Sequence, residues 1–310
     1  MKCTELDKLI IVYNSKIRIF IFCFFIFFLN VLTSIAFSQT KIFLVAGQSN
    51  AQALGDSSLS NVYIRSNPGL YYEYKYSGDY LSLLKDPVGV ELPLYNPFLQ
   101  SFYGSSWPSF AKTYVQLSGN KIILVHTTRG STSLHPKAEK FVGNVGSWDS
   151  QDILFNASVK KTNMALRHTG LALSGIIWWQ GETDADAIKL NKISKEDYKI
   201  SLENLIYQYR EIYGKTLKFY IVQLGRRYWD HDNNTSTAMV IDDLGYAEIR
   251  HIQDEIDLND EHTSIVCRPF TFFGLAGYKS DGFHYNQQSL NKIGEEIAKK
   301  IVELENIEIK

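Results

Sequence analysis

The chain has 310 residues, of which 45 % are hydrophobic and 21 % charged, and its formal net charge is −1. These values are typical of a globular chain that buries a core, and they exclude disorder over the whole length. A net charge near zero argues against a protein held to nucleic acid by bulk positive charge, so we expect no nucleic-acid partner. The three cysteines are too few for a disulfide scaffold.

The N-terminal segment has the pattern of a secretory signal. Lys16 and Arg18 precede an apolar run, and small residues stand at positions 36 and 38, which a signal peptidase reads. We therefore predict a signal peptide over 1–38 and a protein that is secreted or periplasmic. The alternative is an uncleaved anchor over 19–37, a stretch nearly long enough to span a bilayer. A membrane becomes a partner only in that second case.

Cleavage leaves a single predicted domain over 39–310, with one cysteine. That residue, Cys267, ends an apolar run, so we expect a buried and inert thiol rather than a nucleophile. The absence of an internal disulfide means that the core itself must hold the domain together.

Five short segments are apolar on consecutive residues, a pattern typical of strands that are buried on both faces. They are Ile42–Ala46, Ile122–Val125, Gly175–Trp179, Phe219–Gln223 and Ser264–Cys267.

Apolar residues at helical spacing lie between or after these strands, around 110–117, 198–212, 249–256 and 290–301. Gly119 is a stop signal for the first of these helices, and Ser194 with Asp197 resembles a capping box for the second. Strands that alternate with helices predict an α/β fold, a three-layer α/β/α sandwich around a mostly parallel sheet of about five strands, as in flavodoxin-like proteins.

Residues 61–104 interrupt this alternation. The segment is rich in Tyr, contains several Pro and Gly, and has no clear period. We expect a long insertion of loops near the top of the sheet. A role in binding and a role as a small satellite core both remain open.

Two motifs contain residue types suited to nucleophilic catalysis, although a serine after a strand is more often a helix cap and an Asp-x-x-His loop is more often incidental. The first predicted strand runs into Gly47-Gln48-Ser49, so that a glycine turn presents a hydroxyl at the carboxyl edge of the sheet, where open α/β folds bind ligands. Near the C-terminus, Asp281 precedes His284 by three residues. A serine needs a base, and the imidazole needs a carboxylate that fixes its tautomer.

Two further polar motifs follow buried strands. Gln180 leaves the strand that ends at Trp179, and its side-chain amide is placed to donate a hydrogen bond. Gly130 follows the second strand, where a backbone N–H can stabilise an oxyanion. All four motifs are expected at one edge of the sheet.

Together the motifs resemble those of the SGNH hydrolase superfamily, and more closely those of its sialate O-acetylesterase-related carbohydrate esterases. The resemblance extends over nearly all of residues 39–310. It rests on Gly47-Gln48-Ser49-Asn50, Gly130-Ser131-Thr132-Ser133, Trp179-Gln180-Gly181-Glu182-Thr183-Asp184-Ala185 and Asp281-Gly282-Phe283-His284.

The resemblance implies a secreted serine esterase that removes O-acetyl groups from carbohydrates. Ser49 is then the nucleophile, His284 the base and Asp281 its partner. The oxyanion hole would combine the amides of Ser49 and Gly130 with the side chain of Gln180. The implied partner is an O-acetylated carbohydrate.

The same resemblance implies a supporting role for Glu182, which would hold a loop or the histidine, and it implies no metal and no organic cofactor. One departure concerns Ser131, which stands where a second glycine is expected and makes the local turn less certain. Arg129, beside it, is expected to form a surface ion pair rather than to contact an anionic substrate.

Three alternative interpretations remain open from the sequence. Gly47-x-Ser49-x-Ala51 is close to the nucleophile elbow of α/β-hydrolases, although several strands normally precede that elbow. A metal-dependent hydrolase lacks support, because no two of the seven histidines have ligand spacing. A non-catalytic carbohydrate-binding protein would use the aromatic residues of 61–107, but binding alone needs no nucleophile with a base.

Overall fold

The computed structural model describes residues 38–52, 54–61, 69–91, 97–98, 103–139, 146–149, 152–229, 240–241, 243–279 and 281–308. The predicted signal peptide lies outside these residues except for Ser38. Within the described part of the chain, no helix is long and apolar enough to cross a membrane. Residues 40–310 form one compact unit.

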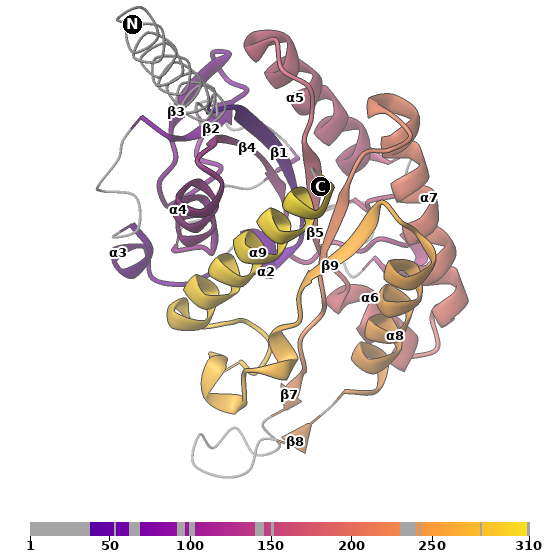
Figure 1. The fold of residues 1–310 in the computed structure, drawn as a ribbon. Coiled ribbons are helices and arrows are strands. Elements are labelled where there is room, and N and C mark those ends of the chain that lie inside the picture. Colours follow the sequence, from indigo (N-terminus) through magenta and orange to yellow (C-terminus); the bar gives the residue numbers. More distant parts are fainter. Residues whose placement is uncertain are drawn as a thin grey trace, which may run out of the picture. The chain divides into compact units, whose positions relative to one another are not determined.

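A seven-stranded sheet forms the middle layer, with the strand order β3-β2-β4-β1-β5-β6-β9 (Figure 1). All neighbouring strands are parallel except β2 and β3. The strands are β1 (Thr40–Gly47), β2 (Tyr71–Lys75), β3 (Tyr80–Leu83), β4 (Lys121–Thr128), β5 (Gly175–Trp179), β6 (Phe219–Val222) and β9 (Thr263–Cys267). The five predicted strands are confirmed as β1, β4, β5, β6 and β9.

The sheet has two strands more than the sequence predicted, and both come from the Tyr-rich segment. Residues of β2 pair in parallel with β4, and β3 closes the edge as an antiparallel hairpin partner of β2. The expectation of loops throughout this segment is therefore wrong for 71–83. The charged residues Glu73 and Lys75 interrupt the apolar pattern of β2, so the sequence did not indicate a buried strand there. Both side chains are nevertheless buried, because they form an ion pair with each other.

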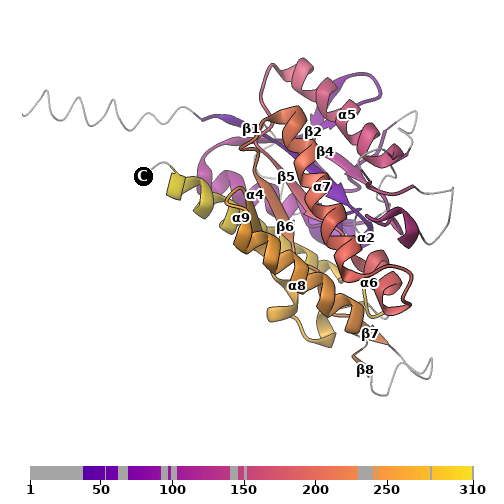
Figure 2. The same cartoon turned by 90° about the vertical axis from the view of Figure 1, so that its right-hand side faces the viewer.

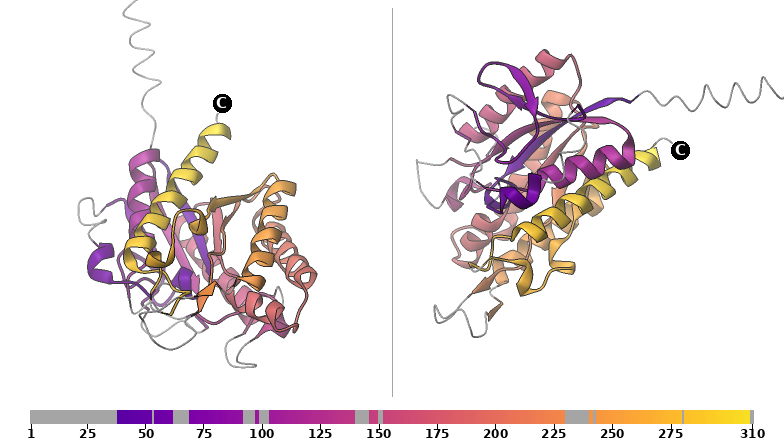
Figure 3. Two further views of the ribbon diagram at one scale, coloured as in Figure 1. Left: turned by 90° about the horizontal axis from the view of Figure 1, so that it is seen from below. Right: turned by 90° about the vertical axis from the view of Figure 1, so that its left-hand side faces the viewer.

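Helices cover both faces of the sheet (Figures 2 and 3). One face carries α4 (Trp107–Ser118) and α9 (Gln287–Glu308), which pack against each other. The other carries α5 (Ile153–Thr169), α6 (Glu182–Lys189), α7 (Lys195–Tyr213) and α8 (Leu244–Asn259). The predicted three-layer α/β/α sandwich is confirmed.

The remaining elements are short. They are α2 (Ser49–Gln52), α3 (Ser57–Ser60), the 3-10 turns η2 (Pro136–Ala138), η3 (Pro269–Thr271) and η4 (Leu275–Gly277), and a separate ribbon of β7 (Tyr228–Trp229) with β8 (Val240–Ile241).

The first strand shows why the strand sequences are apolar on consecutive residues. Ile42 and Leu44 belong to the core on the α5–α8 face, whereas Phe43 and Val45 belong to the core on the α4–α9 face. All four side chains are fully buried. Burial of a Val, Leu, Ile or Phe side chain is worth about 1.5–3 kcal/mol, so both layers anchor this strand at the centre of the sheet.

The predicted helix ends agree with the structure at two points. Ser194 and Asp197 form the reciprocal capping box at the start of α7, and Gly119 ends α4 with φ 72°, a left-handed conformation that glycine adopts readily. The thiol of Cys267 is buried at the end of β9, and burial raises its pKa, as an inert cysteine requires.

Candidate active site

The turn after β1 places Ser49 at the carboxyl edge of the sheet. Gly47 has φ 144°, and a Cβ there would lie 2.0 Å from the carbonyl oxygen of Trp179 at the end of β5. Only glycine allows this approach of the two strand ends. The chain then turns into α2, whose first residue is Ser49.

The loop before α9 brings the histidine to the serine. His284 Nε2 lies 2.9 Å from Ser49 Oγ, and His284 Nδ1 lies 2.7 Å from Asp281 Oδ2. Gly282 between the two loop residues has φ 74°, and a Cβ on it would lie 2.1 Å from the carbonyl oxygen of Tyr228. The structure thus joins carboxylate, imidazole and hydroxyl in one hydrogen-bonded chain.

The carboxylate of Asp281 is held in its charged form. Burial raises its pKa, but the hydrogen bond with the His284 side chain and the bonds from the backbone amides of His284 and Phe283 lower it, and the net pKa lies below the ordinary value. These amides donate to Oδ1, at 2.9 Å and 3.2 Å, while Oδ2 faces the imidazole. An ionised Asp281 therefore fixes the Nδ1–H tautomer, which leaves Nε2 as an acceptor for the serine proton.

Asn50 fastens the histidine loop to α2. Its Nδ2 donates to the backbone oxygen of Phe283 at 3.0 Å, and its Oδ1 accepts from the amide of Tyr285 at 3.3 Å, so it grips the loop on both sides of His284. Glu182 Oε1 accepts the other bond of Nδ2, at 2.7 Å, and so fixes which way the Asn50 amide faces. Burial raises the pKa of Glu182, and the bond from Asn50 lowers it in part.

Gly130 lies beside the serine, as expected, but its amide has a partner. A Cβ on Gly130 would lie 3.5 Å from the Cβ of Ser49, so the two backbones are close. The Gly130 N–H donates to Gln52 Oε1 at 2.7 Å. The Gln52 oxygen therefore occupies the acceptor position at the Gly130 amide.

The structure does not bring the Gln180 side chain to the serine. Gln180 is fully buried, and its Nε2 lies 2.6 Å from Asp184 Oδ2, with Gln48 Oε1 and the Thr132 carbonyl oxygen at 3.2 Å and 3.3 Å. This differs from the expected position in an oxyanion hole. The reason is that the fully buried carboxylate of Asp184 attracts the amide to the inside of the sheet edge.

A pocket of about 310 Å³ opens over the serine and the histidine. Its other lining residues come from loops and from the helices α2, α6 and α8: Gln48, Gln52, Leu54, Gly130, Ser131, Glu182, Thr183, Asp186, Arg227, Tyr246 and Phe283. Among the described residues, no group of His, Cys, Asp and Glu is arranged to hold a metal ion.

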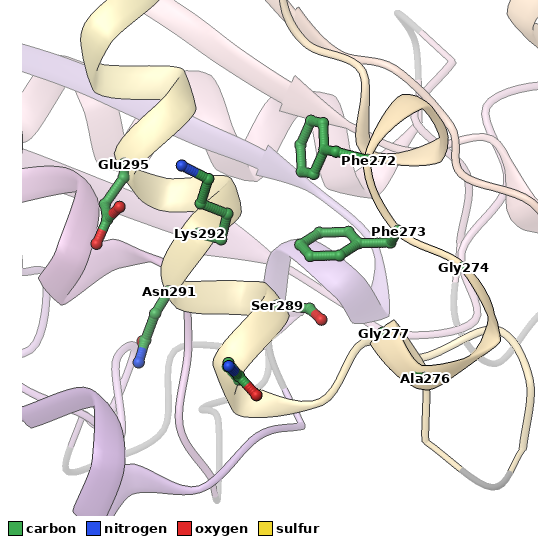
Figure 4. A pocket seen from close by; sticks show the side chains of 10 residues that line it. Phe272, Phe273, Gly274, Ala276, Gly277, Ser289, Asn291, Lys292 and Glu295 are labelled. Carbon is green, nitrogen blue, oxygen red and sulfur yellow. The ribbon is translucent and has the colours of Figure 1, made fainter.

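A second cavity, of about 490 Å³, lies between the 272–277 segment and the start of α9 (Figure 4). Phe272 and Phe273 face Lys292 of α9 across it. This cavity is larger than the first, but its lining contains no pair of nucleophile and base. The chemistry of the fold is therefore concentrated in the smaller pocket.

The comparisons with known proteins identify the family of the chain. Residues 39–303 match the family model of the carbohydrate esterases described as sialic acid-specific acetylesterases. The chain belongs to this family. It is thus a carboxylic ester hydrolase of the carbohydrate acetylesterase type. No match was found among curated proteins.

Solved structures show the same SGNH-type fold. A protein from Arabidopsis thaliana is 17 % identical with a TM-score of 0.62, over 86 % of this chain and 98 % of its own. NanS is 14 % identical with a TM-score of 0.57, over 88 % and 99 %. A carbohydrate acetylesterase from Xanthomonas citri is 18 % identical with a TM-score of 0.54, over 84 % and 55 %.

Sequence reasoning missed several residues of the pocket. Gln52 lies one helical turn after Ser49, which was the only signal that it faces the same side. Asp186 lies four residues after Glu182 on α6, but Arg227 and Tyr246 come from a loop after β6 and from α8, and no local pattern connects them.

Proposed function

We propose that the chain is a secreted serine esterase that removes O-acetyl groups from carbohydrates through an acetyl-Ser49 intermediate. The observation that carries this proposal is the hydrogen-bonded order of Asp281, His284 and Ser49 at the floor of an open pocket. Family membership supports the acetylated carbohydrate as substrate class.

In the proposed mechanism, His284 Nε2 takes the proton of Ser49 while Oγ attacks the acetyl carbonyl. The tetrahedral species collapses, and the sugar oxygen leaves with the proton from His284. Water then attacks the acetyl-serine, again with His284 as base, and acetate is released. Asp281 stabilises the imidazolium that forms twice in this cycle.

The proposed oxyanion hole uses the amides of Ser49 and Gly130. The Gln52 oxygen now accepts the Gly130 N–H, and it marks a position that the substrate oxygen would take after Gln52 turns away. Each such donor is worth about 3–4 kcal/mol of transition-state stabilisation. The buried amide of Gln180 is left as a support of the strand end, and Glu182 supports the histidine loop through Asn50.

Acetate release from an activated aryl acetate and from O-acetylated sugars tests the proposal. The Ser49→Ala variant is expected to lose at least about a thousandfold in turnover with an unchanged circular dichroism spectrum. Ser201→Ala, on α7 and outside the pocket, is the matched control. Full turnover by the Ser49 variant would exclude the acetyl-serine route.

Export is the second part of the proposal. Its test is the N-terminal sequence of the protein recovered from the expressing cells. A chain that begins at Gln39 supports cleavage after Ser38, whereas an intact N-terminus in the membrane fraction supports the anchor.

A further inference from the structure

An ion pair forms one wall of the catalytic pocket. Arg227 Nη1 donates to Asp186 Oδ1, and both residues line the cavity together with Ser49 and His284. The two side chains keep 14 % and 28 % of their surface exposed, so the pair is reachable from the pocket but not freely solvated.

Neighbouring groups fix the guanidinium in place. The Tyr246 side chain is hydrogen-bonded to Arg227. The guanidinium carbon of Arg227 lies 5.8 Å from the centre of the Phe283 ring, and Phe283 directly precedes His284. The pair therefore lies beside the histidine loop and lines the same pocket as Ser49 and His284.

Few charged side chains line the pocket. Among the described lining residues, Arg227 is the one Lys or Arg, and Asp186 neutralises it. Glu182 adds a buried carboxyl group whose pKa is raised by burial, and Asp281 lies outside the lining, bonded to His284. Lys279 does not line the pocket, and its ammonium group is bonded to the Leu54 carbonyl oxygen.

A sugar hydroxyl and a sugar carboxylate would bind to the Asp186–Arg227 pair in different ways. A hydroxyl both donates and accepts, so it can bond to a paired carboxylate and guanidinium without breaking the pair. A carboxylate needs an unpaired cation, and here it would have to displace Asp186 from Arg227 or lie beside the Asp186 charge.

We propose that the Asp186–Arg227 pair makes this pocket select O-acetylated neutral sugars over O-acetylated sugars that carry a carboxylate. This inference rests on the proposed esterase function of the same pocket. Asp186 and Arg227 would thus determine whether a neutral or a charged sugar ester is the better substrate.

Two esters that differ only at the carboxylate give the sharpest test: a methyl 3-O-acetylglucoside and the corresponding methyl 3-O-acetylglucuronide. The wild-type ratio of kcat/KM is expected to favour the glucoside by roughly tenfold or more, from charge repulsion across a few ångströms of a partly solvated pocket. Added salt should reduce this ratio.

Asp186→Asn removes the neutralising charge and keeps the shape of the side chain. The ratio is expected to shift by roughly tenfold toward the glucuronide, because Arg227 then presents its full charge. Asp260→Asn is the matched control, since Asp260 also pairs with an arginine, Arg210, at similar exposure but outside the pocket. A ratio is independent of the fraction of active enzyme.

Hydrolysis of the aryl acetate distinguishes a failure of the proposed esterase function from a failure of the proposed charge selection. If the wild type does not hydrolyse it, the proposed esterase function fails. If the wild type hydrolyses it but prefers the glucuronide, treats the two sugar esters alike or hydrolyses neither, the charge selection is overturned. An unchanged ratio in Asp186→Asn also overturns it.

Discussion

Two groups of polar side chains in this chain differ in how far they are exposed to solvent. At the pocket, Asp281, His284 and Ser49 form an open chain, with the side chains of Asp281 and His284 exposed by 37 % and 13 %. Beside β2 and β4, the pairs Lys75–Glu73 and Lys161–Glu91 are sealed, and no side chain of the four is more than 8 % exposed.

A histidine, His126, also lies next to the sealed pairs, and its environment differs from that of His284. His126 on β4 is fully buried, and burial together with the charges of Lys161 and Lys75 lowers its pKa well below the ordinary value. Its Nε2 contacts the Thr128 hydroxyl. A histidine thus becomes a candidate base through a carboxylate partner and access to substrate, and burial alone makes it a neutral part of the core.

The sealed pairs have a structural task. Glu73 accepts from the amide of Gly89 at 2.7 Å, and Glu91 accepts from the amide of Ser77 at 3.1 Å. Lys161 on α5 also donates to the carbonyl oxygen of His126 at 2.9 Å. These bonds fasten the Tyr-rich segment to the sheet, which is how an insertion without a continuous apolar pattern stays folded.

The largest expected effect is on turnover at the open chain. Asp281→Asn removes the charge that stabilises the imidazolium and presents the wrong group to Nδ1, so kcat for an aryl acetate is expected to fall by about 10²–10⁴-fold. Glu91→Gln, in the sealed group, is expected to leave kcat per folded molecule unchanged. Active molecules are counted by labelling the serine with a fluorophosphonate. Equal losses in both variants would erase the distinction between the two groups.

The second expected effect is on stability, and here the sealed pairs matter more than the open chain. Lys161→Met leaves Glu91 charged and buried without its partner, so the free energy of unfolding in urea is expected to fall by about 3–5 kcal/mol. The double variant Lys161→Met/Glu91→Leu is expected to recover much of this loss, because no unpaired charge is left. A single variant that unfolds like the wild type would show that the pair is solvated in solution.

The sequence predicted the part of the fold that depends on local patterns. The five central strands are apolar on consecutive residues because both faces are covered, and glycine and serine capping signals marked the helix ends. The Tyr-rich segment was misjudged, because burial of Glu73 and Lys75 depends on a pairing that period analysis does not detect. Without a clear period, the segment was predicted to form loops.

The residues of the candidate site that lie in local motifs were predictable, and the partners that meet only in the folded chain were not. Ser49, Asp281 and His284 lie in short motifs with glycine turns, and their approach follows from the parallel sheet. The partners of Gln180 and Gly130 were not predictable, since Asp184 and Gln52 compete for these amides only in the folded chain. The Asp186–Arg227 pair joins two distant segments and left no local signal.

The third effect is a difference in pH dependence between the two regions. Burial and, to a lesser extent, the charge of Glu73 raise the pKa of Asp86, hydrogen bonds from Ser105 lower it in part, and the net pKa is about 6. The folded state therefore holds this proton more tightly than the unfolded state. Asp86 favours folding below about pH 4, and this contribution is lost as the pH rises to 6.

Asp281 has the opposite sign. Its lowered pKa stabilises the fold above the unfolded pKa, and this contribution is lost as the pH falls through the folded value. Urea unfolding at pH 4 and pH 7 of the wild type and Asp86→Asn measures the first part. The pH-dependent difference between the two proteins is expected to be roughly 3 kcal/mol, with the variant gaining relative stability at pH 7. A pH-independent difference would mean that Asp86 titrates normally.

The smallest effect distinguishes two residues with positive φ, one in each region. Ser131 at the pocket has φ 64° and Asp79 in the β2–β3 turn has φ 49°. Glycine adopts this conformation without the Cβ penalty of about 1–2 kcal/mol, and its greater freedom in the unfolded chain offsets part of the gain. Ser131→Gly is therefore expected to stabilise the protein by up to about 1 kcal/mol.

Asp79→Gly relieves the same conformation but is expected to destabilise the protein by about 1 kcal/mol. The reason is that Asp79 Oδ1 accepts from the Tyr74 hydroxyl at 2.6 Å, and a buried hydroxyl that loses its partner costs about 1–3 kcal/mol. Thermal unfolding of the two variants side by side measures the difference. If both glycines stabilise, the backbone conformation alone governs these turns. If they have opposite signs, the left-handed residue at the pocket is tolerated strain, whereas the one in the turn is retained for its side chain.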